Sequence, residues 1–193
     1  MRRLAALLAC CAALTACVTP RPASIPAPWQ QRSAELARAK EWQLDGRAAV
    51  AVGTQGWQAS LTWRQRGAEE AELHLAGPLG VGALVLKVTP EGLSLNGTPP
   101  GDTVLAQLQD KLGFELPINE LRYWLLGVPS PEGGEFSLTR NPEDRARQLI
   151  QDGWTVDYDR YLPIQGDLLP TRVVLSREGV RVRIAVDHWE APR

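Results

Sequence analysis

Residues 57–64, WQASLTWR, decide the type of fold. Apolar side chains stand at every second position from Trp57 to Trp63, and mostly polar ones fill the positions between them. Successive side chains of a β-strand point to opposite faces, so this alternation predicts a strand with one apolar and one solvent-facing side. A strand of this kind buries its apolar face only beside similar strands, which predicts a sheet that covers a core.

Similar period-two segments recur before and after this stretch. Their apolar members are Leu44, Ala48, Val50, Val52, Leu73, Leu75, Leu84, Leu86, Val88, Leu93, Leu95, Phe136, Leu138, Leu149, Ile150, Trp154, Val156, Tyr158, Val173, Leu175, Val180, Val182, Ile184 and Val186. The connections are short and carry Gly, Asn or Pro, including a turn predicted at Asn96-Gly97. We therefore expect a mainly β protein with about ten or eleven strands in a single curved antiparallel sheet.

Three segments favour helices instead. Residues 29–40, WQQRSAELARAK, are rich in helix formers. In the second segment Asp102 is the expected N-cap and Gly113 the expected end, and the third covers residues 119–126. The apolar side chains of the two central helices are Val104, Leu105, Leu108, Leu112, Leu121, Trp124 and Leu125. These helices are the natural cover for the apolar face of the sheet, with either a cavity or a filled core between them.

The amino end predicts export and lipidation. Arg2 and Arg3 precede an apolar run that is too short to cross a bilayer, as in a secretory signal peptide. The run ends in Leu14-Thr15-Ala16-Cys17, which resembles the bacterial lipobox and predicts lipidation at Cys17. The earlier sequence Leu7-Leu8-Ala9-Cys10 would leave too short an apolar region.

These features predict three parts of the chain. Residues 1–16 form a signal peptide, residues 17–28 a lipidated, proline-rich tether of roughly 30 Å, and residues 29–193 one folded domain. Val18 stands where an aspartate would favour the inner membrane, which predicts the periplasmic face of the bacterial outer membrane. Several acyl chains give stable anchoring there.

Composition argues against several classes of function. All three cysteines lie within residues 1–17, so the mature domain has none for disulfides, thiol catalysis or zinc. Residues 1–16 carry two arginines and no acid, so their removal takes the formal charge from −1 to −3. This balance predicts no basic patch for nucleic acid or anionic lipid. The chain also has no HExxH, GxSxG or phosphate-loop motif, and we expect no enzyme, cofactor or metal.

Three motifs resemble the LolB family of outer-membrane lipoprotein receptors. They are GPLG at residues 77–80, LRYWLLGVP at residues 121–129 and VRIAVDHW at residues 182–189, all behind the lipobox. The resemblance implies an incomplete β-barrel with helices inside its open side and a hydrophobic cavity for acyl chains. It also implies a monomer that takes acylated lipoprotein cargo from the periplasmic carrier LolA and inserts it into the inner leaflet of the outer membrane, without a cofactor.

The resemblance further implies two functional regions. Pro78, Leu79 and Gly80 match a protruding loop whose leucine aids membrane insertion; the alternative is a turn leucine folded back on the sheet. One leucine contributes only about 0.5 kcal/mol at a bilayer centre, so it would assist cargo release rather than anchor the protein. The candidate cavity wall is Trp57, Leu61, Trp63, Leu73, Leu84, Leu86, Trp124, Leu125, Trp154, Val156, Ile184 and Val186.

The sequence leaves three alternative functions open. A soluble carrier of the same route is disfavoured by the lipobox, and a lipid-modifying enzyme by the missing nucleophile and base. A structural or adaptor lipoprotein with a filled core would show the same alternation. Full burial of three acyl chains, about 45 methylenes at about 0.8 kcal/mol each, would exceed known non-covalent affinities of roughly 20 kcal/mol. A receptor would therefore need a shallow, partly open cavity.

Overall fold

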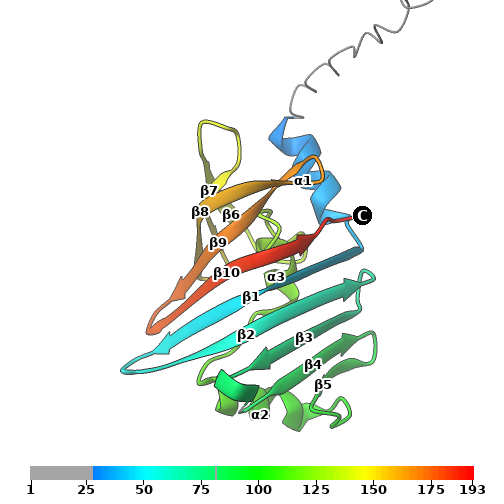
Figure 1. Ribbon diagram of the computed structural model, residues 1–193, viewed down its shortest axis with the longest axis vertical. Helices are drawn as coiled ribbons and strands as arrows, with labels where there is room; N and C mark the ends of the chain where they lie inside the picture. Colours follow the sequence, from blue (N-terminus) through cyan, green and yellow to red (C-terminus); the bar gives the residue numbers. More distant parts are fainter. Residues whose placement is uncertain (1–27, 81) are drawn as a thin grey trace, which may run out of the picture.

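The computed structural model describes residues 28–80 and 82–193 (Figure 1). The predicted signal peptide, Cys17 and residues 18–27 of the predicted tether lie outside the described residues. Within this part of the chain, no helix is long and apolar enough to span a membrane.

Ten strands form one antiparallel sheet in the described residues (Figure 1). They are β1 (Glu41–Val52), β2 (Gln55–Arg66), β3 (Ala71–Ala76), β4 (Leu84–Thr89), β5 (Gly92–Leu95), β6 (Phe136–Arg140), β7 (Ala146–Gln151), β8 (Trp154–Ile164), β9 (Asp167–Arg177) and β10 (Val180–Glu190). Their order is β5-β4-β3-β2-β1-β10-β9-β8-β7-β6. Because β5 and β6 are separate edges, the sheet is not closed, which confirms the expected incomplete barrel.

The burial pattern of β2 confirms the alternation from which the fold was predicted. Ala59, Leu61 and Trp63 are buried, whereas Gln58 and Ser60, on either side of Ala59, are exposed. The indole of Trp63 stacks on Trp42 of the neighbouring strand β1, with ring centroids 5.8 Å apart and 14° between the planes. We call the apolar side of the sheet, on which α2 and α3 pack, the inner face, and the opposite side the outer face.

The helices of the described residues are α1 (Trp29–Ala37), α2 (Asp102–Leu112) and α3 (Ile118–Trp124), with one short 3-10 turn, η1 (Pro78–Gly80). The expected end of α2 at Gly113 is confirmed, because Gly113 has φ 82° in the left-handed region that favours glycine. The expected N-cap was wrong by one residue. Gly101, whose backbone is extended, is the N-cap, and Asp102 is already the first helical residue.

The predicted apolar stripe of α2 is also corrected at one position. Val104, Leu108 and Leu112 are spaced four residues apart and are buried, but Leu105 is 61% exposed. Each helical residue is rotated by about 100° from the one before it, so a core contact centred on Val104 turns Leu105 toward solvent. The inner surface of α2 is therefore narrower than the sequence suggested.

Candidate functional site: a hairpin tip and an apolar hollow

The hairpin between β3 and β4 presents a leucine to solvent. The two strands pair through Leu73–Leu86 and Leu75–Leu84, and η1 joins them. Leu79 is 103% exposed, so its side chain does not fold back on the sheet. Its φ of 59° lies in the left-handed region, which is unfavourable by roughly 1–2 kcal/mol for a residue other than glycine. The fold thus holds an apolar side chain in water on a strained backbone, and Pro78 and Gly80 beside it are exposed as well.

An apolar hollow lies between the inner face of the sheet and residues 112–125. It is lined by Ala48, Val50, Trp57, Leu61, Trp63, Leu73, Leu75, Leu112, Phe114, Leu116, Leu121, Leu125, Val182 and Ile184. Its volume is about 40 Å³. On the same measure one water needs roughly 10–15 Å³, so the hollow has room for a few waters and a fatty chain enters only if the walls move.

Half of the predicted wall residues line this hollow. They are Trp57, Leu61, Trp63, Leu73, Leu125 and Ile184. The others lie elsewhere in the same apolar core, and they are Leu84, Leu86, Trp124, Trp154, Val156 and Val186. The period-two pattern identifies the face on which a residue lies but not its height along the strand, so it could not separate these two groups.

Buried hydrogen bonds attach α3 to the sheet. The indole N–H of Trp124 donates to Oε1 of Gln151 at 3.0 Å, and the Tyr158 hydroxyl donates to the Trp124 carbonyl at 2.9 Å. Gln151 also accepts from the Ser130 N–H at 2.9 Å and donates to the Ser130 carbonyl at 2.8 Å. Burial raises the pKa of the Tyr158 phenol well above its ordinary value, so the hydroxyl remains a donor.

Gln151 was not among the residues predicted from the sequence, although its position in the pattern gave a signal. Gln151 is two residues beyond Leu149, and residues at this spacing share one face of a strand. Both side chains are buried, with 0% of Leu149 and 1% of Gln151 exposed. A glutamine on an apolar face needs partners for its amide, and here those partners fix α3 and the loop that follows it.

The segment around α2 is attached differently. Within the described structure, no hydrogen bond or ion pair joins the side chains of residues 103–117 to any other residue, and their backbone bonds outside the helix are local. Apolar contact holds the segment instead, through the buried Val104, Leu108, Leu112 and Phe114. The Phe114 ring meets Trp154 edge-on at 6.2 Å between centroids. Apolar burial is largely non-directional, so a shift of this segment would leave no side-chain polar group of residues 103–117 without a hydrogen bond that it makes now.

A more polar pocket opens beside the hollow. It has a volume of about 290 Å³ and includes Trp63, Gln65, Ile118, Arg122 and Glu132 among its lining residues. Trp63 also lines the hollow and donates its indole N–H to Oε1 of Gln65 at 3.0 Å. This side chain therefore separates the apolar interior from a pocket that is open to solvent.

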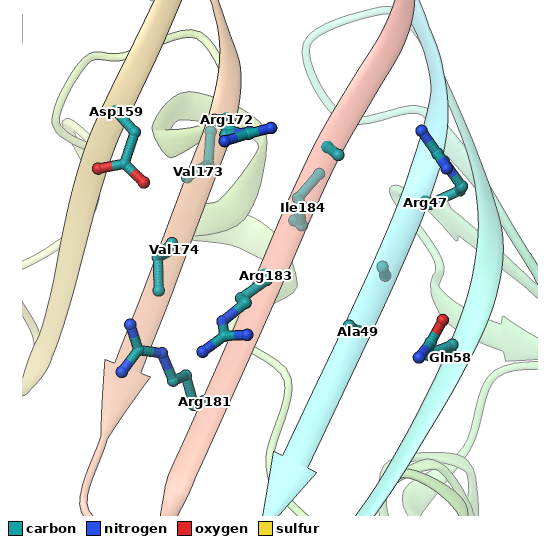
Figure 2. A pocket seen from close by; sticks show the side chains of 12 residues that line it. Arg47, Ala49, Gln58, Asp159, Arg172, Val173, Val174, Arg181, Arg183 and Ile184 are labelled. Atoms are coloured by element: carbon teal, nitrogen blue, oxygen red, sulfur yellow. The ribbon is translucent and has the colours of Figure 1, made fainter.

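The outer face carries a third pocket, a trough of about 530 Å³ shown in Figure 2. Its lining includes Arg47, Arg172, Arg181 and Arg183. The expectation of no basic patch, drawn from the net charge, was therefore wrong. Net charge sums over the whole surface, whereas strand pairing brings arginines from three strands onto one area.

The described residues contain no group of three or more His, Cys, Asp or Glu side chains that could hold a metal ion. His74 bonds to Glu72 on the same strand, and His188 is exposed on β10. Both histidines therefore lie in strands, apart from the apolar hollow.

Comparison with known proteins places this arrangement in a family. The family described as outer membrane lipoprotein LolB matches residues 40–189. The outer-membrane lipoprotein LolB of Alkalilimnicola ehrlichii is 37% identical over 198 residues, which cover 98% of this chain and 98% of the relative. That of Pseudomonas savastanoi pv. phaseolicola is 32% identical over 191 residues, which cover 97% and 92%.

A solved structure shares the fold. The crystal structure of a LolA superfamily protein from Nitrosomonas europaea aligns with a TM-score of 0.55 at 10% sequence identity and covers 86% of this chain and 94% of its own. At this identity the likeness concerns the fold alone, whereas the sequence matches extend over nearly the whole chain. The chain belongs to the LolB family of outer-membrane lipoproteins.

Proposed function

We propose that this outer-membrane lipoprotein, whose family takes part in lipoprotein localisation, accepts acylated lipoproteins from the carrier LolA and inserts them into the inner leaflet of the outer membrane. In this proposal, the acyl chains bind on the inner face of the sheet, beneath α2. The observation that carries it is a wholly apolar hollow, one part of whose cover, Leu112, Phe114 and Leu116, belongs to a segment whose described side chains make apolar contacts alone.

Binding requires the α2 segment to move outward, because the hollow of about 40 Å³ is too small for an acyl chain. The side chains of Val104, Leu108 and Leu112 would then leave the sheet as methylenes of the cargo replace them. Each methylene gains about 0.8 kcal/mol on burial, but exposure of the α2 residues offsets part of this gain. The net affinity is thereby reduced, which suits a receptor that must release its cargo to a bilayer without an energy source.

The entry route runs past Trp63 in this proposal. The indole stands between the hollow and the polar pocket, and its hydrogen bond to Gln65 lies at the boundary. Arg122 lies in the same pocket, with its guanidinium 4.3 Å from the centre of the Tyr123 ring. A rotation of Trp63 together with the shift of α2 would join the two spaces into one groove.

Filling the hollow tests acyl-chain binding. Ala48 lines the hollow, and Ala48→Leu adds three carbon atoms there. We expect transfer from LolA loaded with radiolabelled lipoprotein to fall by about tenfold, equivalent to about 1.4 kcal/mol, because the added side chain competes with the cargo. The control is Ala51→Leu, on the same strand but exposed on the outer face. Equal transfer by both variants would rule out this binding site.

A charge at the hairpin tip tests membrane insertion separately. Leu79→Asp should still accept cargo from LolA but release it slowly into liposomes, because a carboxylate does not enter the apolar part of the leaflet. Thr54→Asp, in the exposed turn between β1 and β2, adds the same charge at another turn and serves as the control. Normal release by Leu79→Asp would exclude a role for the tip.

The small size of the hollow favours a second candidate, a structural or adaptor lipoprotein with a filled core. The two candidates differ in whether hydrocarbon enters the protein. A fluorescent fatty acid should bind to the intact protein and be displaced by unlabelled fatty acid if the transfer proposal is right. Absence of binding, with normal folding, would favour the adaptor.

A further inference from the structure

The arginines of the outer face are gathered by strand register. Arg183 of β10 lies between Ala49 of β1 and Val174 of β9. One step along the strands, Ala185 lies between Arg47 and Arg172. Figure 2 shows Arg183 between Val174 and Ala49, with Arg47, Arg172 and Arg181 farther out on the same face. This arrangement gives long cationic side chains an open space above a shallow surface.

Most of this positive charge has no internal partner. Arg47 pairs with Asp187 through two hydrogen bonds of 3.2 and 2.9 Å. Arg172, Arg181 and Arg183 make no side-chain hydrogen bond or ion pair with any of the described residues. Asp159 is the single carboxylate among the residues that line the trough, against four arginines. Neighbouring like charges repel across a sheet, so an external anion would stabilise the cluster.

The hairpin tip lies next to this trough along the sheet. Gln58 of β2 lines the trough, and Ser60, two residues away, is paired with Ala76 at the end of β3. The chain enters η1 two residues after Ala76, and η1 contacts β2. The exposed Leu79 therefore stands near the edge of a cationic surface. Apolar side chains beside cations are typical of segments that bind the interface of a membrane.

We propose that this trough docks on the outer membrane itself by binding the phosphate groups of anionic phospholipids in the inner leaflet. The planar guanidinium group binds phosphate oxygens through two parallel hydrogen bonds. A lipoprotein of this family is anchored in the membrane that carries these phosphates. Docking would orient the sheet on the membrane and keep the Leu79 tip at its surface. The proposal concerns the outer face and does not depend on transfer of acyl chains.

An acidic protein partner fits the trough less well. Protein interfaces are centred on buried aromatic or aliphatic anchors. The large exposed apolar residues of the described structure are Leu79, Leu105, Phe136, Ile150 and Leu162, and none of them lines the trough. Apart from the hairpin tip beside it, the trough offers charge without such an anchor, which suits phosphate groups better than a protein surface.

The test uses the lipidated protein reconstituted in vesicles, with a fluorescent dye on an Ala51→Cys variant. Ala51 is exposed on β1 and pairs with Arg181 at the trough. In vesicles of phosphatidylcholine and phosphatidylglycerol, the dye should be protected from an aqueous quencher, and added salt should reduce the protection. In phosphatidylcholine alone it should be accessible. Equal accessibility in both vesicles would overturn the proposal.

Replacement of Arg172, Arg181 and Arg183 by Gln should lower the ratio of docked to undocked protein by about fivefold per arginine. The control replaces three exposed arginines elsewhere by Gln, and these are Arg38, Arg66 and Arg147. It changes the net charge equally and should keep the protection. An equal loss in both triple variants would indicate net charge rather than a site and would overturn the proposal.

Two further measurements with the same dye identify the source of the anion. Inorganic phosphate, added to protein in phosphatidylcholine vesicles, should leave the dye accessible, because a free ion does not cover the trough. A soluble polyglutamate peptide should likewise protect the dye less than phosphatidylglycerol does. Stronger protection by the peptide would assign the trough to an acidic protein and overturn membrane docking. Cargo acceptance from LolA, measured on the same variants, tests the acyl-transfer proposal independently.

Discussion

The two central helices cover the same face of the sheet but are attached to it in different ways. Two buried hydrogen bonds fix α3. The Trp124 indole N–H donates to Gln151, and the Trp124 carbonyl accepts from the Tyr158 hydroxyl. For α2, the described side chains from residue 103 onward make apolar contacts alone. Directional bonds to buried groups fix one position, whereas apolar contacts tolerate displacement if other apolar groups replace them. In the proposed function, this difference makes α3 the fixed wall and α2 the part of the cover that moves.

The largest expected effect is on the α3 attachment. Gln151→Ala leaves the Trp124 indole N–H and the Ser130 N–H buried without partners, so it should lower the free energy of unfolding by about 4 kcal/mol. Urea unfolding of the purified protein measures this. Gln148→Ala on the same strand removes one half-buried bond to Asp157 and should lower it by less than about 1 kcal/mol. Similar losses for the two variants would contradict the special role of Gln151.

A matched pair of leucines compares the helical cover directly. Leu125, which follows α3, and Leu108 of α2 are both buried. Leu125→Ala should lower the free energy of unfolding by about 3 kcal/mol, because its fixed surroundings leave a cavity. Leu108→Ala should lower it by only about 2 kcal/mol, since the α2 segment can move inward. Equal losses of unfolding free energy in the two variants would show that α2 and the region of α3 are equally rigid.

The smallest effect concerns Tyr158. Tyr158→Phe should lower the free energy of unfolding by about 1 kcal/mol at neutral pH, because the Trp124 carbonyl keeps a bond from the Gly127 N–H at 3.0 Å. Burial raises the pKa of Tyr158 in the folded protein, while the unfolded phenol titrates near about pH 10. The stability that Tyr158 contributes is therefore fully present below about pH 10 and is lost as the pH rises above that value.

The phenylalanine variant should accordingly lose less stability than the natural protein between neutral pH and about pH 11. Urea unfolding at a series of pH values checks this. Both proteins should still lose some stability at alkaline pH, because burial raises the pKa of Tyr161 as well. Identical pH profiles would mean that Tyr158 ionises in the folded protein as readily as in the unfolded chain.

Local patterns in the sequence determined most of the fold. The alternation from Trp57 to Trp63 identified the buried face of β2, and Gly113 identified the end of α2. Asn96-Gly97 identified a turn, in which both residues have positive φ. Each of these signals depends on backbone geometry within a few residues, so no knowledge of distant pairing was needed. The family followed from three short motifs in a fixed order behind a lipobox.

Tertiary structure alone decided the size of the hollow, the partners of Gln151 and the basic trough. Arg47 and Arg172 are far apart in the sequence, and only the register of β1, β10 and β9 places them on either side of Ala185. The hollow likewise depends on how closely Leu112 and Phe114 approach the sheet. Periodicity assigns a side chain to a face of one strand, whereas volume and charge clustering depend on which strands are neighbours and on how their residues align.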